Sequence, residues 1–334
     1  MNLPVYGADA NSIMPLQVTR CEIDETAERL FSLESSWNAL FAATIINTQA
    51  LSDLILVGSG DSWTAALTAA VYLEQRTTLR CRVLQTYDFL QSNLHRYGQE
   101  TLIVMISASG RPSPVLDAIN YALTSSAQVI GITNGPGSPF SKTTPNMLFT
   151  QAQKKGFPTQ STSATLYLLL RLADALGTNS DSVTWLTTQP ESQFSTIKKD
   201  WQSKDLDFYR KNKLIFLGSN LSWGMALSGM NLLSCGPQIH ADAFLIEEFY
   251  HSLRLNQVSE GHHFILLPAT LADANFYHAT YQSLLKKGAT AEIVDYLDNS
   301  ENPLHIFLRM QWLYEMSWNL ACDFIKRGGQ RVTC

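Results

Sequence analysis

The sequence contains one short stretch twice, at an offset of 160 residues. Residues 54–67 read LILVGSGDSWTAAL and residues 214–227 read LIFLGSNLSWGMAL, with eight identical residues in fourteen ungapped positions. In each copy an apolar run leads into a Gly/Ser turn and then into a helical pattern. An internal repeat of this kind predicts that the chain holds two copies of one domain.

The apolar runs of both halves lack the alternation of a half-exposed strand. Runs such as LILVG, LIVMIS, LIFLG and FILLP are continuously apolar, which is typical of parallel strands covered by helices on both faces. Helical patterns lie between such runs, over 112–126 in the first half and over 271–287 in the second. The predicted fold class is therefore α/β, with two tandem doubly wound parallel-sheet domains.

The segments outside the repeat set the expected domain boundaries. We predict a helical N-terminal lead-in over 1–50, a first domain over 51–178, a helical connector over 179–212 and a second domain over 213–334. Within the lead-in the helical pattern covers roughly 24–50. A closing helix is expected over 304–326.

Composition and charge exclude several classes of protein. The net charge is −5, and no run of Lys or Arg indicates a nucleic-acid-binding surface. The longest apolar stretch, 164–176, is too short to span a bilayer, so we expect no membrane partner. The N-terminus lacks a basic stretch followed by an apolar run, and we expect a cytoplasmic protein. The five cysteines lie far apart and form no C-x-x-C pair, so no metal site is expected.

The first Gly/Ser turn, GSGDSW, lies where doubly wound sheets bind ligands, between the carboxyl end of a strand and the start of a helix. A dinucleotide fingerprint would place a third glycine where Trp63 stands, and G-x-x-x-x-G-K-[ST] is absent. We therefore expect no nucleotide cofactor. The turn offers instead a flexible backbone at Gly60 and the hydroxyl of Ser62, groups that suit an anion such as phosphate.

A second serine-rich turn, ISASGRPSPVLDAI, precedes the next helical pattern. Two neighbouring turns of this kind can hold one phosphate through amides and hydroxyls, and the candidate residues of the second turn are Ser107, Ser109, Gly110 and Ser113. One alternative is that the serines only cap their helices. The occurrence of two such turns favours ligand binding. In the first turn Asp61 is replaced by Leu221 in the repeat, which suggests that only the first copy binds phosphate.

The motifs GSGDSW, ISASGR and ITNGPGSPF, in this order and spacing, resemble the SIS (sugar isomerase) domain family. The doubled arrangement resembles the isomerase half of glutamine–fructose-6-phosphate aminotransferase and related sugar-phosphate isomerases, deaminases and deglycases. The resemblance covers about residues 50–327. It implies that Ser62, Ser107 and Ser109 bind the phosphate of a sugar phosphate, and that the protein is a homodimer.

The stretch IHADAFLIEEFYHSL (239–253) resembles the family segment that carries acid–base groups. On that match His251 takes the place of the ring-opening histidine, and Glu248 takes the place of the acidic residue three positions before it. On a helix Glu247 and Glu248 lie at i,i+4 and i,i+3 from His251, so either carboxylate can reach the imidazole. The alternative is an exposed helix with an ordinary ion pair.

Other positions depart from the family pattern. Leu232 and Cys235 stand where the family carries a lysine and then its catalytic glutamate. The loop KKGFPTQST reverses a charge at Lys154 and replaces a lysine with Ser161. Three functions stay open. One is an aldose–ketose isomerase, a second is a deglycase or deaminase of an amino-linked sugar 6-phosphate, and a third is a non-catalytic phosphosugar binder or sensor.

Overall fold

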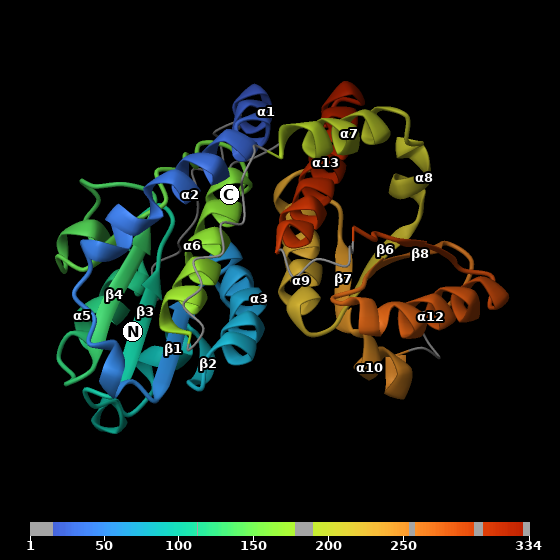
Figure 1. Ribbon diagram of the computed structural model, residues 1–334. Helices are drawn as coiled ribbons and strands as arrows, with labels where there is room; N and C mark the ends of the chain where they lie inside the picture. Colours follow the sequence, from blue (N-terminus) through green and yellow to red (C-terminus); the bar gives the residue numbers. More distant parts are fainter. Residues whose placement is uncertain (1–15, 112, 178–189, 254–257, 297–302, 330–334) are drawn as a thin grey trace. The chain divides into compact units, whose positions relative to one another are not determined.

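The structure is a computed structural model that describes residues 16–111, 113–177, 190–253, 258–296 and 303–329. The chain folds into two compact units. Unit 1 comprises Met1–Asp24, Lys155–Phe157 and Pro190–Cys334, and unit 2 comprises Glu25–Lys154 and Pro158–Gln189. Each unit has one parallel sheet flanked by helices (Figure 1), which confirms the predicted α/β class. The predicted domain boundaries stay a prediction.

The sheet of unit 2 has five strands in the order β2-β1-β3-β4-β5, all parallel to their neighbours. They are β1 (Asp53–Gly58), β2 (Arg80–Gln85), β3 (Thr101–Ile106), β4 (Gln128–Thr133) and β5 (Met147–Phe149). The central strand β3 is buried along its whole length and β1 along all but its first residue. This burial explains their continuous apolar sequences.

Helices cover both faces of this sheet (Figure 1). They are α2 (Thr26–Ala42), α3 (Asp61–Arg76), α4 (Thr86–Leu90), α5 (Pro114–Ala122) and α6 (Gln160–Leu176). The helix α6 packs against α2 and α3, and α4 packs on α5. Ile55, Ile103 and Met105 form a core with Phe89 and Ile119 of α4 and α5. The first fourteen residues of α6 are buried.

The sheet of unit 1 has four parallel strands in the order β7-β6-β8-β9. They are β6 (Lys213–Gly218), β7 (Ala241–Leu245), β8 (His262–Leu267) and β9 (Thr290–Ile293). Taken in chain order, these strands are arranged like the first four strands of unit 2. The repeated sequence therefore falls on β1 and α3 in one unit and on β6 and α9 in the other.

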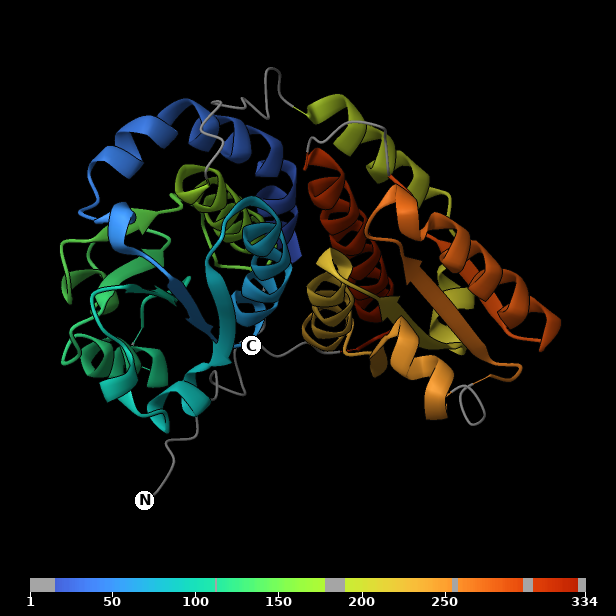
Figure 2. The same ribbon diagram turned by 60° about the horizontal axis from the view of Figure 1, so that its bottom comes forward.

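The helices of unit 1 also lie on both faces of its sheet (Figure 2). They are α1 (Leu16–Asp24), α7 (Glu191–Gln202), α8 (Leu206–Lys211), α9 (Leu221–Cys235), α10 (Ile246–Glu248), the π-helix η4 (Phe249–Leu253), α12 (Ala274–Lys286) and α13 (Leu304–Lys326). The long helix α13 packs against α1, α7 and α9. Its bounds confirm the predicted closing helix. Within the described ranges, every helix is too short or too polar to cross a membrane.

Several predicted boundaries are wrong. The helix expected over roughly 24–50 is the shorter α2, which ends at Ala42, and the helix α1 before it was not predicted. The helix expected over 112–126 begins at Pro114, because proline fits the first turn of a helix, where its missing N–H costs no hydrogen bond. The strand β9 ends at Ile293 and is an edge strand of its sheet, paired with β8.

Candidate functional site

The first Gly/Ser turn of unit 2 connects β1 to α3. Gly60 precedes the helix with φ 56° and ψ −129°, a conformation that side chains disfavour and that glycine adopts freely. Gly58 ends the strand, and a Cβ there would lie 3.0 Å from Cβ of Ser62. The Ser59 hydroxyl donates to Oγ1 of Thr86, 2.8 Å away. The two glycines thus bring the first turn of α3 close to the end of the strand.

The second serine-rich turn follows β3. The Ser107 amide donates to the carbonyl oxygen of Ile132, which ties the start of the turn to β4. Gly110 has φ 59°, and a Cβ on it would lie only 2.1 Å from Oγ of Ser138. This position therefore requires glycine. Ser113 then precedes α5 in an extended conformation.

A third wall comes from the start of α6 and the loop before it, and sequence reasoning did not assign it to the site. Lys154 and Pro158 lie in the loop, and Ser161, Thr162 and Thr165 lie on the helix. The sequence signal was the hydroxyl-rich run TQSTSAT (159–165) after a short strand. In the sequence, Lys154 and Ser161 stand out only as departures from the family pattern.

These three walls enclose one cavity of about 160 Å³ within unit 2. It is lined by Ser59, Asp61, Ser62, Ile106, Ser107, Ala108, Ser109, Ser113, Val115, Lys154, Pro158, Ser161, Thr162 and Thr165. Four of the predicted phosphate-binding residues, namely Ser62, Ser107, Ser109 and Ser113, line it together. Gly60 and Gly110 are not among the lining residues, and they shape the two turns instead.

The N-cap residues of the helices that begin at this cavity do not cap them through their side chains. In the described structure Gly60, Ser113 and Thr159 make no side-chain hydrogen bond to the first turn of α3, α5 and α6, respectively. The hydroxyl of Ser113 is thus not used as an N-cap, contrary to the alternative that the sequence left open. A helix start carries a partial positive charge and unsatisfied amides, so three of them around one cavity favour an anion.

The corresponding turn of unit 1 has the same backbone conformation, but its hydroxyl groups are hydrogen-bonded within the fold. Asn220 has φ 52° and ψ −129°, the conformation of Gly60. The fully buried Ser222 closes the turn, because its Oγ accepts from the Ser219 amide at 3.0 Å and donates to the Ser219 carbonyl oxygen at 2.8 Å. The hydroxyl of Tyr277 lies 2.9 Å from Oγ of Ser219. The hydroxyls of this turn are therefore satisfied within unit 1.

The predicted acid–base residues Glu247, Glu248 and His251 lie after β7 in unit 1, and all three are exposed. The helix there passes from α10 into a π-helix, whose wider i,i+5 turn changes which side chains face each other. Within the described residues no hydrogen bond or ion pair joins His251 to Glu247 or Glu248. The predicted contact is absent, and the catalytic role of these residues stays a prediction.

The two departures in α9 lie at one buried and one half-buried position. Leu232 is buried, and its carbonyl oxygen accepts a hydrogen bond of 2.7 Å from Oγ of Ser317 in α13. Cys235 is half-buried at the last residue of α9. Neither side chain supplies the amine or carboxylate that the family pattern has at these positions.

The comparison with protein families agrees with the motifs of the first repeat. Residues 50–175 match the family model of the SIS domain, which confirms the predicted resemblance for this part of the chain. The chain is also 25% identical over 210 residues to glutamine–fructose-6-phosphate aminotransferase [isomerizing] 2 of Mus musculus. That alignment covers 59% of this chain and 31% of the relative, so the chain spans about a third of the relative's length.

Two solved structures share the fold. The glucosamine-6-phosphate deaminase of Thermotoga maritima has a TM-score of 0.73 and 21% identity, with 92% of this chain and 96% of that chain covered. The C-terminal domain of glucosamine-fructose-6-phosphate aminotransferase from Francisella tularensis has a TM-score of 0.70 and 17% identity, with 91% and 96% covered. At these identities the two structures establish the similarity of fold alone.

Proposed function

We propose that this protein binds a sugar phosphate and holds its phosphate group in the cavity of unit 2. The observation that carries the proposal is that three helix starts of the described structure line one cavity, together with serine hydroxyls and Lys154. Backbone amides and hydroxyls donate hydrogen bonds to phosphate oxygens, and the lysine adds a positive charge. The SIS domain match and the relatives named for fructose 6-phosphate and glucosamine 6-phosphate support a hexose phosphate.

The size of the cavity indicates which part of the ligand it takes. Its volume of about 160 Å³ is below the range of roughly 300–1,000 Å³ that encloses a whole drug-sized ligand. We infer that the cavity holds the phosphate and the adjoining carbon, and that the rest of the sugar extends out of it.

Thermal unfolding tests the binding proposal. A ligand present at 100 times its Kd stabilises the native state by about 2.7 kcal/mol, so a saturating sugar 6-phosphate should raise the melting temperature measurably. Ser109→Ala should remove most of this shift, because the exposed hydroxyl lines the cavity without supporting the core. If no member of a panel of sugar 6-phosphates stabilises the wild-type protein, the proposal is wrong.

For the chemical step we propose aldose–ketose isomerisation. A base removes the proton from C2 of the open-chain aldose phosphate, O1 gains a proton, and an enediol forms. Protonation of C1 and loss of the O2 proton then give the ketose. Glu247, Glu248 and His251 are the proposed acid–base groups, on the basis of their match to the family segment. NMR in D₂O would follow deuterium entering C2 of glucosamine 6-phosphate and glucose 6-phosphate or C1 of fructose 6-phosphate. Exchange at wild-type rates in both His251→Ala and Glu248→Ala would show that the assignment is wrong.

Two other functions have specific support. Lys154 in the cavity wall favours a deglycase or deaminase of an amino-linked sugar 6-phosphate, because a second anionic group on such a substrate would find a cation there. The absence of a hydrogen bond or ion pair between His251 and Glu247 or Glu248 in the described residues favours a non-catalytic binder. Fructosamine 6-phosphates added to the same NMR panel separate these functions. Cleavage indicates the first of them, and binding without turnover indicates the second.

We further propose that unit 1 is a second, diverged SIS domain and that the protein is a homodimer. The shared strand order of the two sheets and the matching dihedral angles at Gly60 and Asn220 support the duplication. The dimer comes from the family resemblance, and light scattering on the purified protein would test it.

A further inference from the structure

The wall of the cavity in unit 2 contains two charged residues of opposite sign. Of the fourteen described residues that line the cavity, only Asp61 and Lys154 carry a charge, and the others bear hydroxyls or are apolar. Both belong to unit 2. The lysine attracts the phosphate of a ligand, whereas the carboxylate of Asp61 repels it. A cavity that binds only an anion would gain nothing from Asp61.

Asp61 is the first residue of α3, directly after Gly60, and it is half-buried. An acidic residue in the first turn stabilises a helix through the helix dipole, so one explanation of Asp61 concerns α3 alone. That explanation does not require a place in the cavity wall. Asp117 lies in the first turn of α5, which also begins at the cavity, but it is exposed and is not a lining residue. The place of Asp61 in the wall therefore calls for a second explanation.

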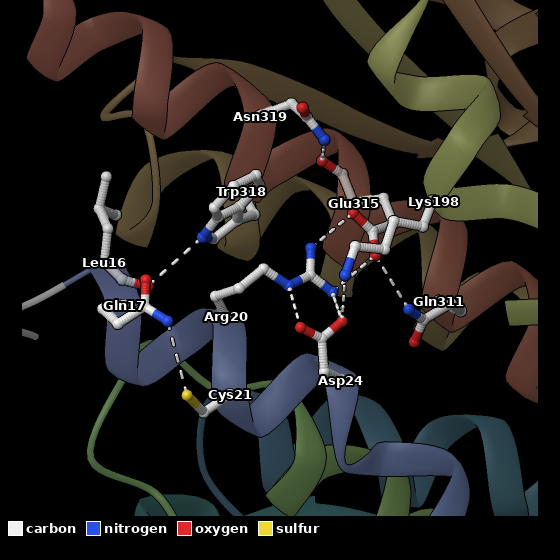
Figure 3. Close-up of polar contacts among 10 residues, drawn as sticks. All are labelled: Leu16, Gln17, Arg20, Cys21, Asp24, Lys198, Gln311, Glu315, Trp318 and Asn319. Carbon is white, nitrogen blue, oxygen red and sulfur yellow. Dashed lines mark hydrogen bonds and ion pairs between the residues drawn. The ribbon is translucent and has the colours of Figure 1, made fainter. Parts of the chain in front are cut away.

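A cluster in unit 1 shows carboxylates whose charge is balanced by cations of the fold (Figure 3). The fully buried carboxylate of Glu315 accepts two hydrogen bonds of 2.8 Å from the guanidinium of Arg20. Arg20 also pairs with Asp24 at 2.7 Å, and Asp24 pairs with Lys198 at 2.8 Å. This cluster holds α1, α7 and α13 together. Asp61 differs from these carboxylates because it lines a cavity that a ligand can enter.

The chemistry of a carboxylate indicates what Asp61 can bind. An ionised carboxylate accepts hydrogen bonds and donates none, so it suits a hydroxyl or an amine of the ligand. A protonated amine is the better partner, because its hydrogen bond to a carboxylate is charge-assisted. A ligand that carries both a phosphate and an ammonium group therefore matches both charges of the wall.

We propose that Asp61 is a specificity-determining residue, which selects sugar phosphates that carry a protonated amine. The serines, the helix starts and Lys154 hold the phosphate, and the carboxylate of Asp61 accepts a hydrogen bond from the amine. This inference rests on the proposed function for the phosphate, and it adds the class of sugar. In the repeat Leu221 replaces Asp61, in the turn whose hydroxyls are bonded within the fold.

Asp61→Asn tests the selection, with Asp117→Asn as the matched control. Both substitutions remove one negative charge from the first turn of a helix that begins at the cavity, but only the first changes the wall. The probes are inorganic phosphate and two sugars that differ only at C2, glucosamine 6-phosphate and glucose 6-phosphate. Calorimetric titration of the wild type at slightly acidic pH, where the amine is protonated, should give a Kd about 3- to 15-fold lower for the amino sugar.

The two substitutions should affect this preference differently. In Asp61→Asn the ratio of the two Kd values should fall to about one, because the charge that selects the amine is gone. The Kd for inorganic phosphate should stay the same or fall, since a repulsive charge is removed. Asp117→Asn should keep the wild-type ratio. Asp61→Glu retains the carboxylate and should keep a preference for the amino sugar.

The outcomes separate this inference from the proposed function. If the wild-type protein binds neither sugar phosphate, the proposed function fails, and the inference fails with it. If both sugars bind and Asp61→Asn leaves their ratio unchanged, only the role of Asp61 is overturned. An equal change of the ratio in Asp117→Asn would assign the preference to the charge of the helix starts and would also overturn it. A raised Kd for inorganic phosphate in Asp61→Asn would show that Asp61 supports the phosphate site instead of selecting the sugar.

Discussion

The β1–α3 turn of unit 2 and the β6–α9 turn of unit 1 follow the same backbone path, with φ of 56° at Gly60 and 52° at Asn220. In unit 2 the serines after this point line an open cavity. In unit 1 Ser222 turns back onto its own backbone, and the hydroxyl of Tyr277 meets Ser219. The same backbone path therefore leaves serines facing a cavity in one unit and bonded within the fold in the other.

The difference teaches that the turn alone does not make an anion site. What matters is whether the polar groups of the turn already have partners inside the fold. A hydroxyl that bonds to its own backbone has little left to offer a ligand, and a buried position such as Leu221 excludes one. The following predictions test this contrast between the two turns, starting with the largest expected effect.

The largest expected effect concerns ligand binding by Ser62 and its counterpart in the repeat, Ser222. Ser62→Ala should weaken binding of a sugar 6-phosphate about 10- to 150-fold, the equivalent of a lost hydrogen bond to a charged group. Ser222→Ala, at the same place in the repeat, should leave the Kd unchanged and lower the melting temperature instead. Calorimetric titration and thermal unfolding of both variants provide the measurement. A loss of binding in Ser222→Ala would show that both turns take part.

The next prediction compares the backbone conformations at Gly60 and Asn220. Gly60→Ala should destabilise the protein by about 1–3 kcal/mol, because a side chain there must adopt a strained conformation. The unfolding free energy of Asn220→Gly should lie within about 0.5 kcal/mol of the wild-type value, because two effects oppose each other. Glycine relieves the backbone strain, but the hydrogen bond from the Leu221 amide to the asparagine side chain is lost. Urea unfolding measures both free energies. Equal destabilisation by the two substitutions would mean that the turns are not equivalent in strain.

The sequence specified most of this architecture for a physical reason. Parallel strands buried on both faces must be apolar throughout, so β1, β3, β6 and β8 are visible in the sequence, and so is the buried helix α6. Edge strands such as β2 and β5 are short or half-exposed and carry no such signal. The helix α1 was also missed, because its buried residues include Arg20 and Glu22, which depend on distant partners.

Part of the candidate site could also be predicted from the sequence, and part of it could not. The serines of two turns were found from their place after strands, and they do line one cavity. The third wall was not found, because Lys154 and Ser161 reach the cavity through a loop that no periodicity describes. The contact expected between His251 and Glu248 assumed an α-helix, and the π-helix at that place could not be predicted from residue spacing.

A smaller effect concerns the hydroxyl that closes the turn of unit 1. Tyr277→Phe removes the contact with Ser219 and should destabilise the protein by about 0.5–1.5 kcal/mol at neutral pH. Binding of the sugar phosphate should not change, because Tyr277 belongs to the closed turn. Urea unfolding and calorimetric titration of the variant test the two parts separately. A change in Kd would contradict the assignment of the ligand to unit 2.

The smallest effect is the contribution of the same hydroxyl at alkaline pH. Burial raises the pKa of Tyr277 above its ordinary value of about 10. Because the folded-state pKa is the higher one, this stabilisation is complete below pH 10 and is lost as the pH rises toward the folded-state value. Between pH 9.5 and 10.5 the unfolding free energy of Tyr277→Phe should therefore fall less steeply than that of the wild type. Unfolding of both proteins in urea across this range measures the difference. Identical slopes would show that this hydroxyl ionises as readily in the native protein as in the unfolded chain, and that the turn of unit 1 is open to water after all.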